Sequence, residues 1–211
     1  MSEKGSLEAT RREQELYDRK SRFYDLMDWP MDAMGMGRLR RRLWEQAQGK
    51  RVLEVGVGTG RNLPHYPPES SVVAVDLSPG MLRRAVRRAG RMGRQVDFVL
   101  ADAQHLPFRE NAFDTVAATC VFCSVPDPVQ GLKELRRVSR SEGSALLLEH
   151  VRAGNPLLGR VMDWLNPIST RFQGVNINRD TVNNVRLAGF DIEREDSFMM
   201  SIVKMLRAKP A

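Results

Sequence analysis

The stretch LEVGVGTGRN, residues 53–62, carries three glycines at every second position directly after a short apolar run. Glycine adopts positive φ more readily than other residues, and its missing side chain lets a ligand come close to the backbone. A buried strand that ends in such a turn is typical of nucleotide-binding α/β domains. The stretch therefore predicts a strand, a tight turn and a ligand held against that turn.

The remainder of the chain alternates between apolar strands and amphipathic helices. Strands are predicted at 51–55, 72–76, 96–102, 113–119, 144–151, 190–196 and 200–209, and helices at 79–92, 127–139, 156–170 and near 179–188. Such alternation predicts a parallel sheet covered by helices on both faces, with a closing hairpin of the last two strands. Residues 1–47 are predicted to form an N-terminal helical extension, interrupted near Trp29 and Pro30, and residues 48–211 the α/β domain.

Composition narrows the class of protein. No run in the 211 residues approaches the ~18–20 apolar residues of a membrane span, and the charged N-terminus does not resemble a secretory signal. Cys120 and Cys123 are too few for a disulfide framework and lack the second ligand pair of a zinc site, so we expect a cytoplasmic protein. The net charge of +7 comes largely from arginines at helical spacing, as in 83–91, without a nucleic-acid-binding motif. We therefore expect no nucleic-acid partner, whereas an anionic membrane surface stays open.

Two kinds of nucleotide ligand compete for the glycine turn. The pattern is G-x-G-x-G, and Arg61 stands where a dinucleotide fingerprint has its third glycine. The acidic Glu54 precedes the turn, where it would repel a pyrophosphate bound at the helix N-terminus. S-adenosylmethionine carries an ammonium and a sulfonium instead, so a nearby carboxylate favours it.

The ends of the next two strands carry further acidic residues. Asp76 lies twenty residues after Gly56 and ends the second strand, where a carboxylate can accept hydrogen bonds from both ribose hydroxyls. Asp102 and Ala103 end the third strand and are placed to meet an adenine edge. Three correctly spaced strand ends favour a nucleotide site over a purely structural explanation.

Five stretches together resemble the successive motifs of a known family: LEVGVGTGRN, VVAVDLSPGML, ADAQHLPF, FDTVAATCVFCSV and LKELRRVSRSEGSALLLEH. They are similar to class I S-adenosylmethionine-dependent methyltransferases, strongly over residues 50–150 and more loosely elsewhere. The local patterns GTGRNLPHYP, CSVPDP and EH most resemble bacterial phosphatidylethanolamine N-methyltransferases, quinone-pathway methyltransferases and microsomal alkyl-thiol methyltransferases. The chain departs from them at residues 141–143, Ser-Glu-Gly, where relatives usually show Arg-Pro-Gly, in a loop remote from the cofactor.

The resemblance implies a Rossmann-like, seven-stranded, mostly parallel sheet whose last strand is antiparallel, with the N-terminal segment folded over the cofactor as a lid. It assigns the three glycines to the methionine part of S-adenosylmethionine, Asp76 to the ribose and Asp102 to the adenine, with Leu77 and Met81 packed on the adenosine. The predicted cofactor-binding residues are Glu54, Gly56, Gly58, Gly60, Asn62, Asp76, Leu77, Met81, Asp102, Ala103 and Thr119.

Methyl transfer from a sulfonium is an in-line displacement with a neutral leaving group, so alignment and water exclusion suffice without a metal or covalent nucleophile. We predict no metal site. His150, at a strand's carboxyl end, and Tyr24, on the extension, are the predicted catalytic residues, although a histidine that merely completes a strand is an equal alternative. Tyr17, Asn176 and Arg179 are predicted to contact the acceptor.

The acceptor is predicted to be small or lipid-like, with the amine of the phosphatidylethanolamine head group favoured. A small thiol or a quinone precursor is the alternative acceptor, and a non-catalytic S-adenosylmethionine-binding protein is the alternative of another class. The basic, aromatic segment 38–44 and the apolar face of 157–168 suggest peripheral association with an anionic membrane. The sequence predicts no oligomeric state.

Overall fold

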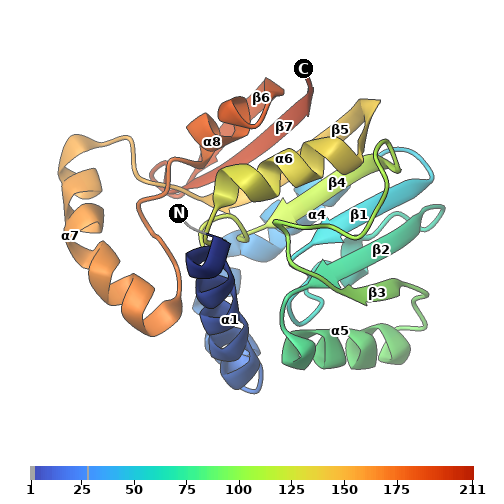
Figure 1. Ribbon diagram of the computed structural model, residues 1–211, viewed down its shortest axis with the longest axis horizontal. Coiled ribbons are helices and arrows are strands. Elements are labelled where there is room, and N and C mark those ends of the chain that lie inside the picture. Colours follow the sequence, from blue (N-terminus) through green and yellow to red (C-terminus); the bar gives the residue numbers. More distant parts are fainter. Residues whose placement is uncertain (1–2, 28) are drawn as a thin grey trace.

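The computed structural model describes residues 3–27 and 29–211, which form an α/β structure around one seven-stranded sheet (Figure 1). The strands are β1 (Arg51–Val55), β2 (Ser71–Asp76), β3 (Asp97–Leu100), β4 (Phe113–Thr119), β5 (Ser139–His150), β6 (Phe190–Phe198) and β7 (Val203–Pro210). Their order in the sheet is β3-β2-β1-β4-β5-β7-β6. The first five strands are parallel, and β7 runs antiparallel to both β5 and β6. The predicted fold class is confirmed.

The helices are α1 (Glu3–Lys20), α2 (Tyr24–Met27), α3 (Trp29–Met31), a π-helical turn η1 (Asp32–Met36), α4 (Gly37–Trp44), a 3₁₀ turn η2 (Leu63–His65), α5 (Pro79–Arg91), α6 (Pro128–Val138), α7 (Pro156–Gln173) and α8 (Thr181–Leu187). The last four begin at polar N-caps, Ser78, Asp127, Asn155 and Asp180, whose side chains accept the first free N–H groups. Gly174 ends α7 with a φ of 71°.

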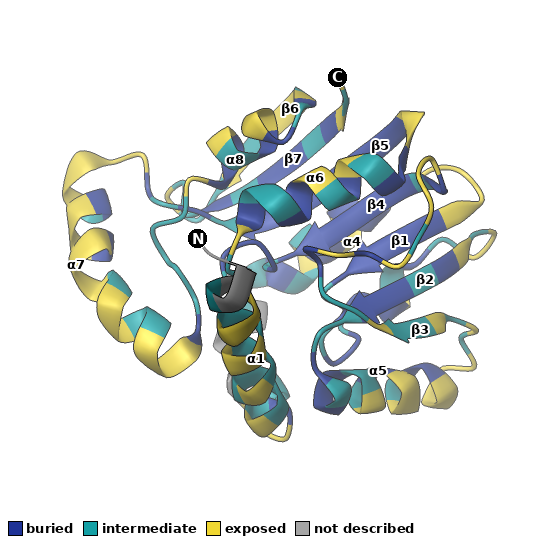
Figure 2. Cartoon of the chain, in the orientation of Figure 1, coloured by how far each residue is buried: buried dark blue, intermediate teal, exposed yellow. Residues whose placement is uncertain are grey.

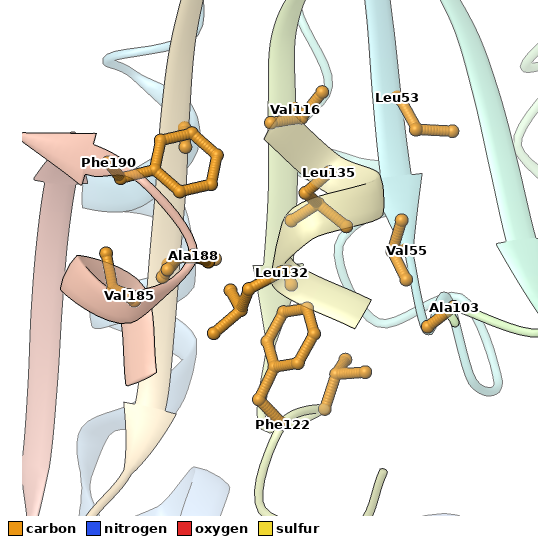
Figure 3. Packing of buried hydrophobic residues seen from close by; sticks show 14 of the residues in the cluster. Leu53, Val55, Ala103, Val116, Phe122, Leu132, Leu135, Val185, Ala188 and Phe190 are labelled. Carbon is orange, nitrogen blue, oxygen red and sulfur yellow. The ribbon is translucent and has the colours of Figure 1, made fainter. Parts of the chain in front are cut away.

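Alternate residues of the buried strands pack on opposite faces of the sheet, which places a hydrophobic core on each side. Leu53 of β1 joins the core beneath α6 and α8, where Figure 3 shows Leu132 and Leu135 packed over the sheet. Val52 joins the core beneath α4, together with Trp44. Helices therefore cover both faces, as predicted, and the carboxyl ends of the parallel strands share one edge.

Four strands differ from their predicted ranges by two residues or more. β6 and β7 do so at the turn between them, where β6 ends at Phe198 and β7 begins at Val203. β3 ends at Leu100, two residues earlier than predicted, because Ala101 and Asp102 leave the strand and line a cavity. β5 begins at Ser139, five residues earlier than predicted, because Phe113 of β4 pairs with Ser139 across an irregularity in register. The residues after the shortened β3 still reach the edge of the sheet where the parallel strands end, and β5 ends within one residue of its predicted position.

The basic, aromatic segment 38–44 packs its apolar side against the sheet, while Arg38, Arg41 and Arg42 are exposed. Leu43 and Trp44 are buried, and the Trp44 ring lies 4.5 Å from the Tyr66 ring. Arg40 is also buried and donates to the side-chain oxygen of Asn62 at 3.2 Å. The expectation that this segment is an interfacial helix is therefore wrong, because the core already covers its apolar side.

Across residues 3–27 and 29–211, every helix is too short or too polar to cross a bilayer.

Candidate active site

A cavity of about 710 Å³, including its opening, lies at the carboxyl ends of β1 to β4. Among its walls are the predicted residues Tyr17, Tyr24, Gly56, Gly58, Asp76, Leu77, Met81, Asp102, Ala103 and Thr119. The other predicted residues, Glu54, Gly60, Asn62, His150, Asn176 and Arg179, lie outside these walls. The sequence therefore located the cavity but not every side chain that faces it.

The three glycines of the turn all have positive φ, but their surroundings differ. A Cβ on Gly56 would lie 2.3 Å from Cγ2 of Val121, and one on Gly60 would lie 2.5 Å from Cδ1 of Leu63. A Cβ on Gly58 would meet nothing within 4 Å, and Gly58 lines the cavity. Gly56 and Gly60 therefore keep the turn packed, whereas Gly58 leaves room beside the turn for a ligand.

Asp76 ends β2 with its carboxylate at the cavity wall. Oδ2 accepts the N–H of Gly58 at 2.7 Å, and Oδ1 accepts the N–H of Ser78 at 2.9 Å. Burial raises the pKa of Asp76 to about 6, against the opposing effect of these backbone donors. A carboxylate offers about four acceptor positions. Each oxygen thus retains acceptor capacity for a pair of hydroxyl groups such as those of a ribose.

Asp102 follows β3 and is held in place by hydrogen bonds. Its Oδ1 accepts the N–H of Gln104 at 2.9 Å, and its Oδ2 accepts from Thr10 at 3.3 Å. The apolar side chains of Leu77 and Met81 form the neighbouring wall. This pairing of a fixed acceptor with an apolar surface suits a flat heterocycle with a polar edge.

Glu54 lies beneath the glycine turn in a buried polar network. Its carboxylate accepts from the side-chain amide of Asn62 and from the hydroxyl of Tyr66. Asn62 also donates to Oγ1 of Thr119 at 3.1 Å and accepts from Arg40. Burial raises the pKa of Glu54 to about 8. The network joins β1, β4 and α4 below the turn, and direct contact of Glu54 with the cofactor stays a prediction.

Helix α1 lies across the strand ends and is held by polar side chains spaced four residues apart. Thr10 donates to Asp102, and Gln14 donates to the carbonyl of Leu77 at 2.9 Å. Oδ1 of Asp18 accepts the N–H of Gly80 at 2.6 Å. Figure 1 shows α1 beside the edge of the sheet where these contacts form. The helix thus bridges the ends of β2 and β3 and the start of α5.

A second set of polar contacts, which we call the Asp25 latch, follows α1 in the chain. Oδ1 of Asp25 accepts from the Thr59 hydroxyl at 2.6 Å, and its Oδ2 pairs with Arg88 at 2.8 Å. Arg61 pairs with the same carboxylate at 3.3 Å. These hydrogen bonds and the cationic partners lower the pKa of Asp25 despite its partial burial. The segment after α1 is therefore tied to the glycine turn itself.

A second cavity adjoins the first. It is lined by Tyr17, Lys20, Tyr24, Met31, Cys120, Cys123, His150, Gln173, Val175 and Ile177. Tyr17, Tyr24 and Cys120 border both cavities. Nδ1 of His150 is buried and has no hydrogen-bond partner among the described residues, and burial lowers the pKa of this histidine. The structure therefore brings both predicted catalytic residues to one compartment beside the cofactor cavity.

Asn176 and Arg179 support the loop after β4 rather than line either cavity. Asn176 donates through its backbone N–H to the carbonyl of Cys123 at 2.8 Å, and Arg179 donates to the carbonyl of Val125 at 3.0 Å. Glu149, which the sequence analysis did not single out, accepts the N–H of Val121 at 2.9 Å. These contacts fix the loop that separates the two cavities, and a role for Asn176 and Arg179 with the acceptor stays a prediction.

Several wall residues were absent from the sequence prediction, notably Glu13 and Val121 of the first cavity and Lys20 of the second. Burial raises the pKa of Glu13 to about 7, against the opposing effect of Lys20. This face of α1 could have been predicted from its polar residues, because Thr10 and Gln14 are spaced four apart and so lie on one side of the helix. Apolar periodicity does not mark it.

Comparison with known proteins shows which family the residues around this site resemble. Residues 53–147 match the family model described as a methyltransferase domain. The chain is 40% identical over 106 residues to a phosphatidylethanolamine N-methyltransferase of Cereibacter sphaeroides, covering 49% of this chain and 52% of that protein. It is 33% identical over 159 residues to a ubiquinone/menaquinone biosynthesis C-methyltransferase of Hahella chejuensis, covering 70% and 63%. The chain thus spans between half and two thirds of the length of these relatives.

Solved structures show the same fold. A SAM-dependent methyltransferase of Thermotoga maritima superposes with a TM-score of 0.72 at 18% identity, covering 94% of this chain and all of that one. Geranyl diphosphate methyltransferase in complex with SAM gives 0.71 at 14% identity, covering 83% and 85%. The [4+2]-cyclase SpnF gives 0.68 at 20% identity, covering 82% and 80%, so the fold also serves another reaction. The resemblance seen in the motifs is confirmed: residues 53–147 match the methyltransferase-domain model, in a chain that has the fold of S-adenosylmethionine-dependent methyltransferases.

Proposed function

We propose that the protein is a methyltransferase that uses S-adenosylmethionine bound in the first cavity. The observation that carries this proposal is the convergence of Gly58, Asp76 and Asp102, from three strand ends, on one cavity that has a second cavity beside it. Gly58 leaves open space beside the turn, and Asp76 retains acceptor capacity for the ribose. The residues present therefore fit the cofactor.

The cofactor would supply an electrophilic methyl group on a sulfonium, and the protein would supply alignment and a dry environment. Helix α1 and the Asp25 latch would keep water from the first cavity. Tyr17, Tyr24 and Cys120, which border both cavities, would set the passage through which acceptor and methyl group meet. No metal is required for this chemistry.

The acceptor we favour is the head-group amine of phosphatidylethanolamine. The second cavity combines apolar walls with one lysine, Lys20, which suits a molecule with acyl chains and a phosphate. An amine attacks only when it is neutral, so its proton must leave. Because burial lowers the pKa of His150 and the residue lines the second cavity, its neutral imidazole is our candidate to accept that proton. One of the relatives carries this activity in its name.

A quinone precursor is the second candidate acceptor. Relatives named as quinone-pathway C-methyltransferases match a larger share of the chain than the phospholipid enzyme does. A quinone precursor has no phosphate, however, so it would leave Lys20 without a role.

The test is a panel of acceptors with product masses read by mass spectrometry. We expect methylated phosphatidylethanolamine from detergent micelles, and little product from a demethylated menaquinone or an alkyl thiol. Lys20→Met should raise KM for the lipid by roughly tenfold, the worth of one charge-assisted contact. Lys133→Met, on the exposed face of α6, is the matched control and should leave KM unchanged.

Methylation of the quinone or the thiol alone would overturn the lipid assignment while leaving the methyltransferase in place. Cofactor binding without turnover on any acceptor would instead support a non-catalytic S-adenosylmethionine-binding protein.

A further inference from the structure

Helix α7 exposes most of its large apolar side chains. Trp164 is 75% exposed and Leu157 is 74% exposed, and Phe172, Ile168, Val161 and Leu165 are exposed as well. Figure 2 shows exposed residues along the length of this helix. Scattered exposed apolar residues are ordinary, but a contiguous set of this size marks an interaction surface. We call these six residues the α7 stripe.

The α7 stripe follows helical geometry. At ~100° per residue, its six positions fall within an arc of roughly 100°. The residues through which α7 contacts the loop before it lie on another side: Gly159 packs against the Arg152 guanidinium, and Met162 accepts the N–H of Ala153. The stripe is thus the outward side of a helix that is held by the loops on either side of it, through these contacts and the hydrogen bond from Ser169 to the carbonyl of Val175.

Basic residues border the α7 stripe along one edge. Arg160 and Arg171 lie at roughly 300° and 320° on the same helical wheel, next to Trp164. Both are exposed, and neither forms an ion pair with another described residue. The one acid of the helix, Asp163, lies at roughly 240°, beyond Arg160 and away from the stripe, and it is paired with Arg152 at 2.8 Å. The exposed side of α7 is therefore apolar and cationic, without negative charge.

The stripe also adjoins the second cavity. Gln173, the last residue of α7, lines that cavity and directly follows Phe172. Across the cavity, Tyr24 directly follows Phe23, whose side chain is 64% exposed. Two residues that line the proposed acceptor site, Gln173 and Tyr24, are thus each preceded in the sequence by an exposed phenylalanine.

We infer that the α7 stripe docks on an anionic phospholipid bilayer, with its apolar residues at the acyl boundary and Arg160 and Arg171 at the head groups. Such a face needs apolar area, a tryptophan for the interface and unpaired cations, and α7 supplies all three. A second copy of the chain is a poorer occupant, because an isologous contact would bring these arginines near their own copies. The inference deepens the proposed function, since docking would present a lipid to the second cavity.

The experiment is co-sedimentation of the full chain with phosphatidylcholine vesicles, with and without about a third phosphatidylglycerol. Binding should require the anionic lipid and should weaken strongly between ~0.1 M and ~1 M salt, as the Debye length falls from about 10 Å to about 3 Å. The double variant Trp164→Ser/Ile168→Ser should bind at least about tenfold more weakly. The matched apolar control is Val86→Ser/Leu187→Ser, at exposed positions on α5 and α8.

The charge test uses Arg160→Glu/Arg171→Glu against Arg87→Glu/Arg91→Glu, which changes the net charge equally on the exposed face of α5. At about 1 kcal/mol per basic residue, only the α7 variant should lose tenfold or more of its vesicle affinity. Equal losses of vesicle affinity in the two double variants would show that only the net charge of the protein matters, and would overturn the α7 assignment. Self-association that the Trp164→Ser/Ile168→Ser variant abolishes, without vesicle binding, would assign the stripe to a second copy instead.

These outcomes separate the docking face from the chemistry. The α7 variants should bind S-adenosylhomocysteine and methylate micellar acceptor as the unmodified protein does, because the substituted residues line neither cavity. Vesicle binding without methylation of any phospholipid would leave the docking face standing and overturn the proposed acceptor. Methylation of micellar lipid without vesicle binding would support the proposed acceptor and overturn the docking face.

Discussion

At the scale of single residues, Gly56 and Gly58 share a motif and a positive φ but have different roles. Val121 occupies the space that a Cβ on Gly56 would need, so Gly56 is required by packing. A Cβ on Gly58 would project into open space at the cavity wall, so packing does not require Gly58, and the proposed ligand is our explanation for it. Substitutions at these two positions of one turn can therefore distinguish an effect on stability from an effect on ligand binding.

Alanine at each of these positions tests the distinction. Gly58→Ala should cost about 1–2 kcal/mol of unfolding free energy, the strain of a Cβ at positive φ, and should weaken S-adenosylhomocysteine binding tenfold or more. Gly56→Ala carries the same strain plus the overlap with Val121, so we expect about 3 kcal/mol or more. Chemical denaturation and calorimetric titration measure the two quantities. Equal stability losses with equal affinities would contradict the separate roles.

The sequence predicted Asp76 better than Glu54, for a physical reason. Asp76 ends its strand, and parallel strands bring their carboxyl ends to one edge whatever the details of packing. Glu54 lies within β1, where the face that its side chain meets depends on the whole sheet. Its partner Tyr66 comes twelve residues later, after a 3₁₀ turn that the pattern of apolar residues does not predict. Spacing thus predicts strand ends but not buried polar networks.

At the scale of elements, α1 is attached to the domain by polar contacts rather than by a core. Gln14 and Asp18 bond to the start of α5 and the loop before it, and Asp25 to the glycine turn. Among the described residues before Trp29, only Ser21 is buried, and none belongs to the hydrophobic core clusters. An element held in this way can leave the domain at little cost in stability, which is what a lid requires.

Removal of residues 1–30 should therefore leave the α/β domain folded and disable the chemistry. We expect a cooperative thermal transition to persist, while turnover falls by about 10²-fold or more because water enters and the acceptor loses alignment. Circular dichroism follows the transition, and formation of S-adenosylhomocysteine follows turnover. A truncated protein with full turnover would exclude the lid, and an unfolded one would show that α1 belongs to the core.

Two amphipathic helices show what sequence cannot decide at this scale. The segments that became α4 and α7 both combine apolar faces with arginines. In α4 the apolar face is buried, with Leu43 and Trp44 in the core beside β5. In α7 it is exposed. Periodicity predicts that a helix has an apolar face, and only the tertiary structure decides whether protein or solvent meets it.

At the scale of the whole molecule, the sheet order places the ends of β3, β2, β1 and β4 side by side, and the cavity follows from that order. Regular alternation of strands and helices made this topology predictable, because parallel strands need crossover helices of one hand. The second cavity was predicted only in part, through Tyr17, Tyr24 and His150, because its other walls come from segments far apart in sequence, such as the loop after β4 and residues 173–177. The fold itself does not select a reaction, so the central claim concerns the ligand.

Calorimetric titration with S-adenosylmethionine tests that claim most directly, at a pH well above the pKa of about 6 of Asp76, where its carboxylate is ionised. We predict a dissociation constant in the micromolar range, roughly −7 to −8 kcal/mol, and no binding of NAD. Asp76→Ala should weaken binding by about 2 kcal/mol through the lost ribose contacts, while Asp97→Ala, at the opposite end of β3, should not. Tight binding of NAD, or an affinity for S-adenosylmethionine that Asp76→Ala leaves unchanged, would contradict the assignment of this cavity.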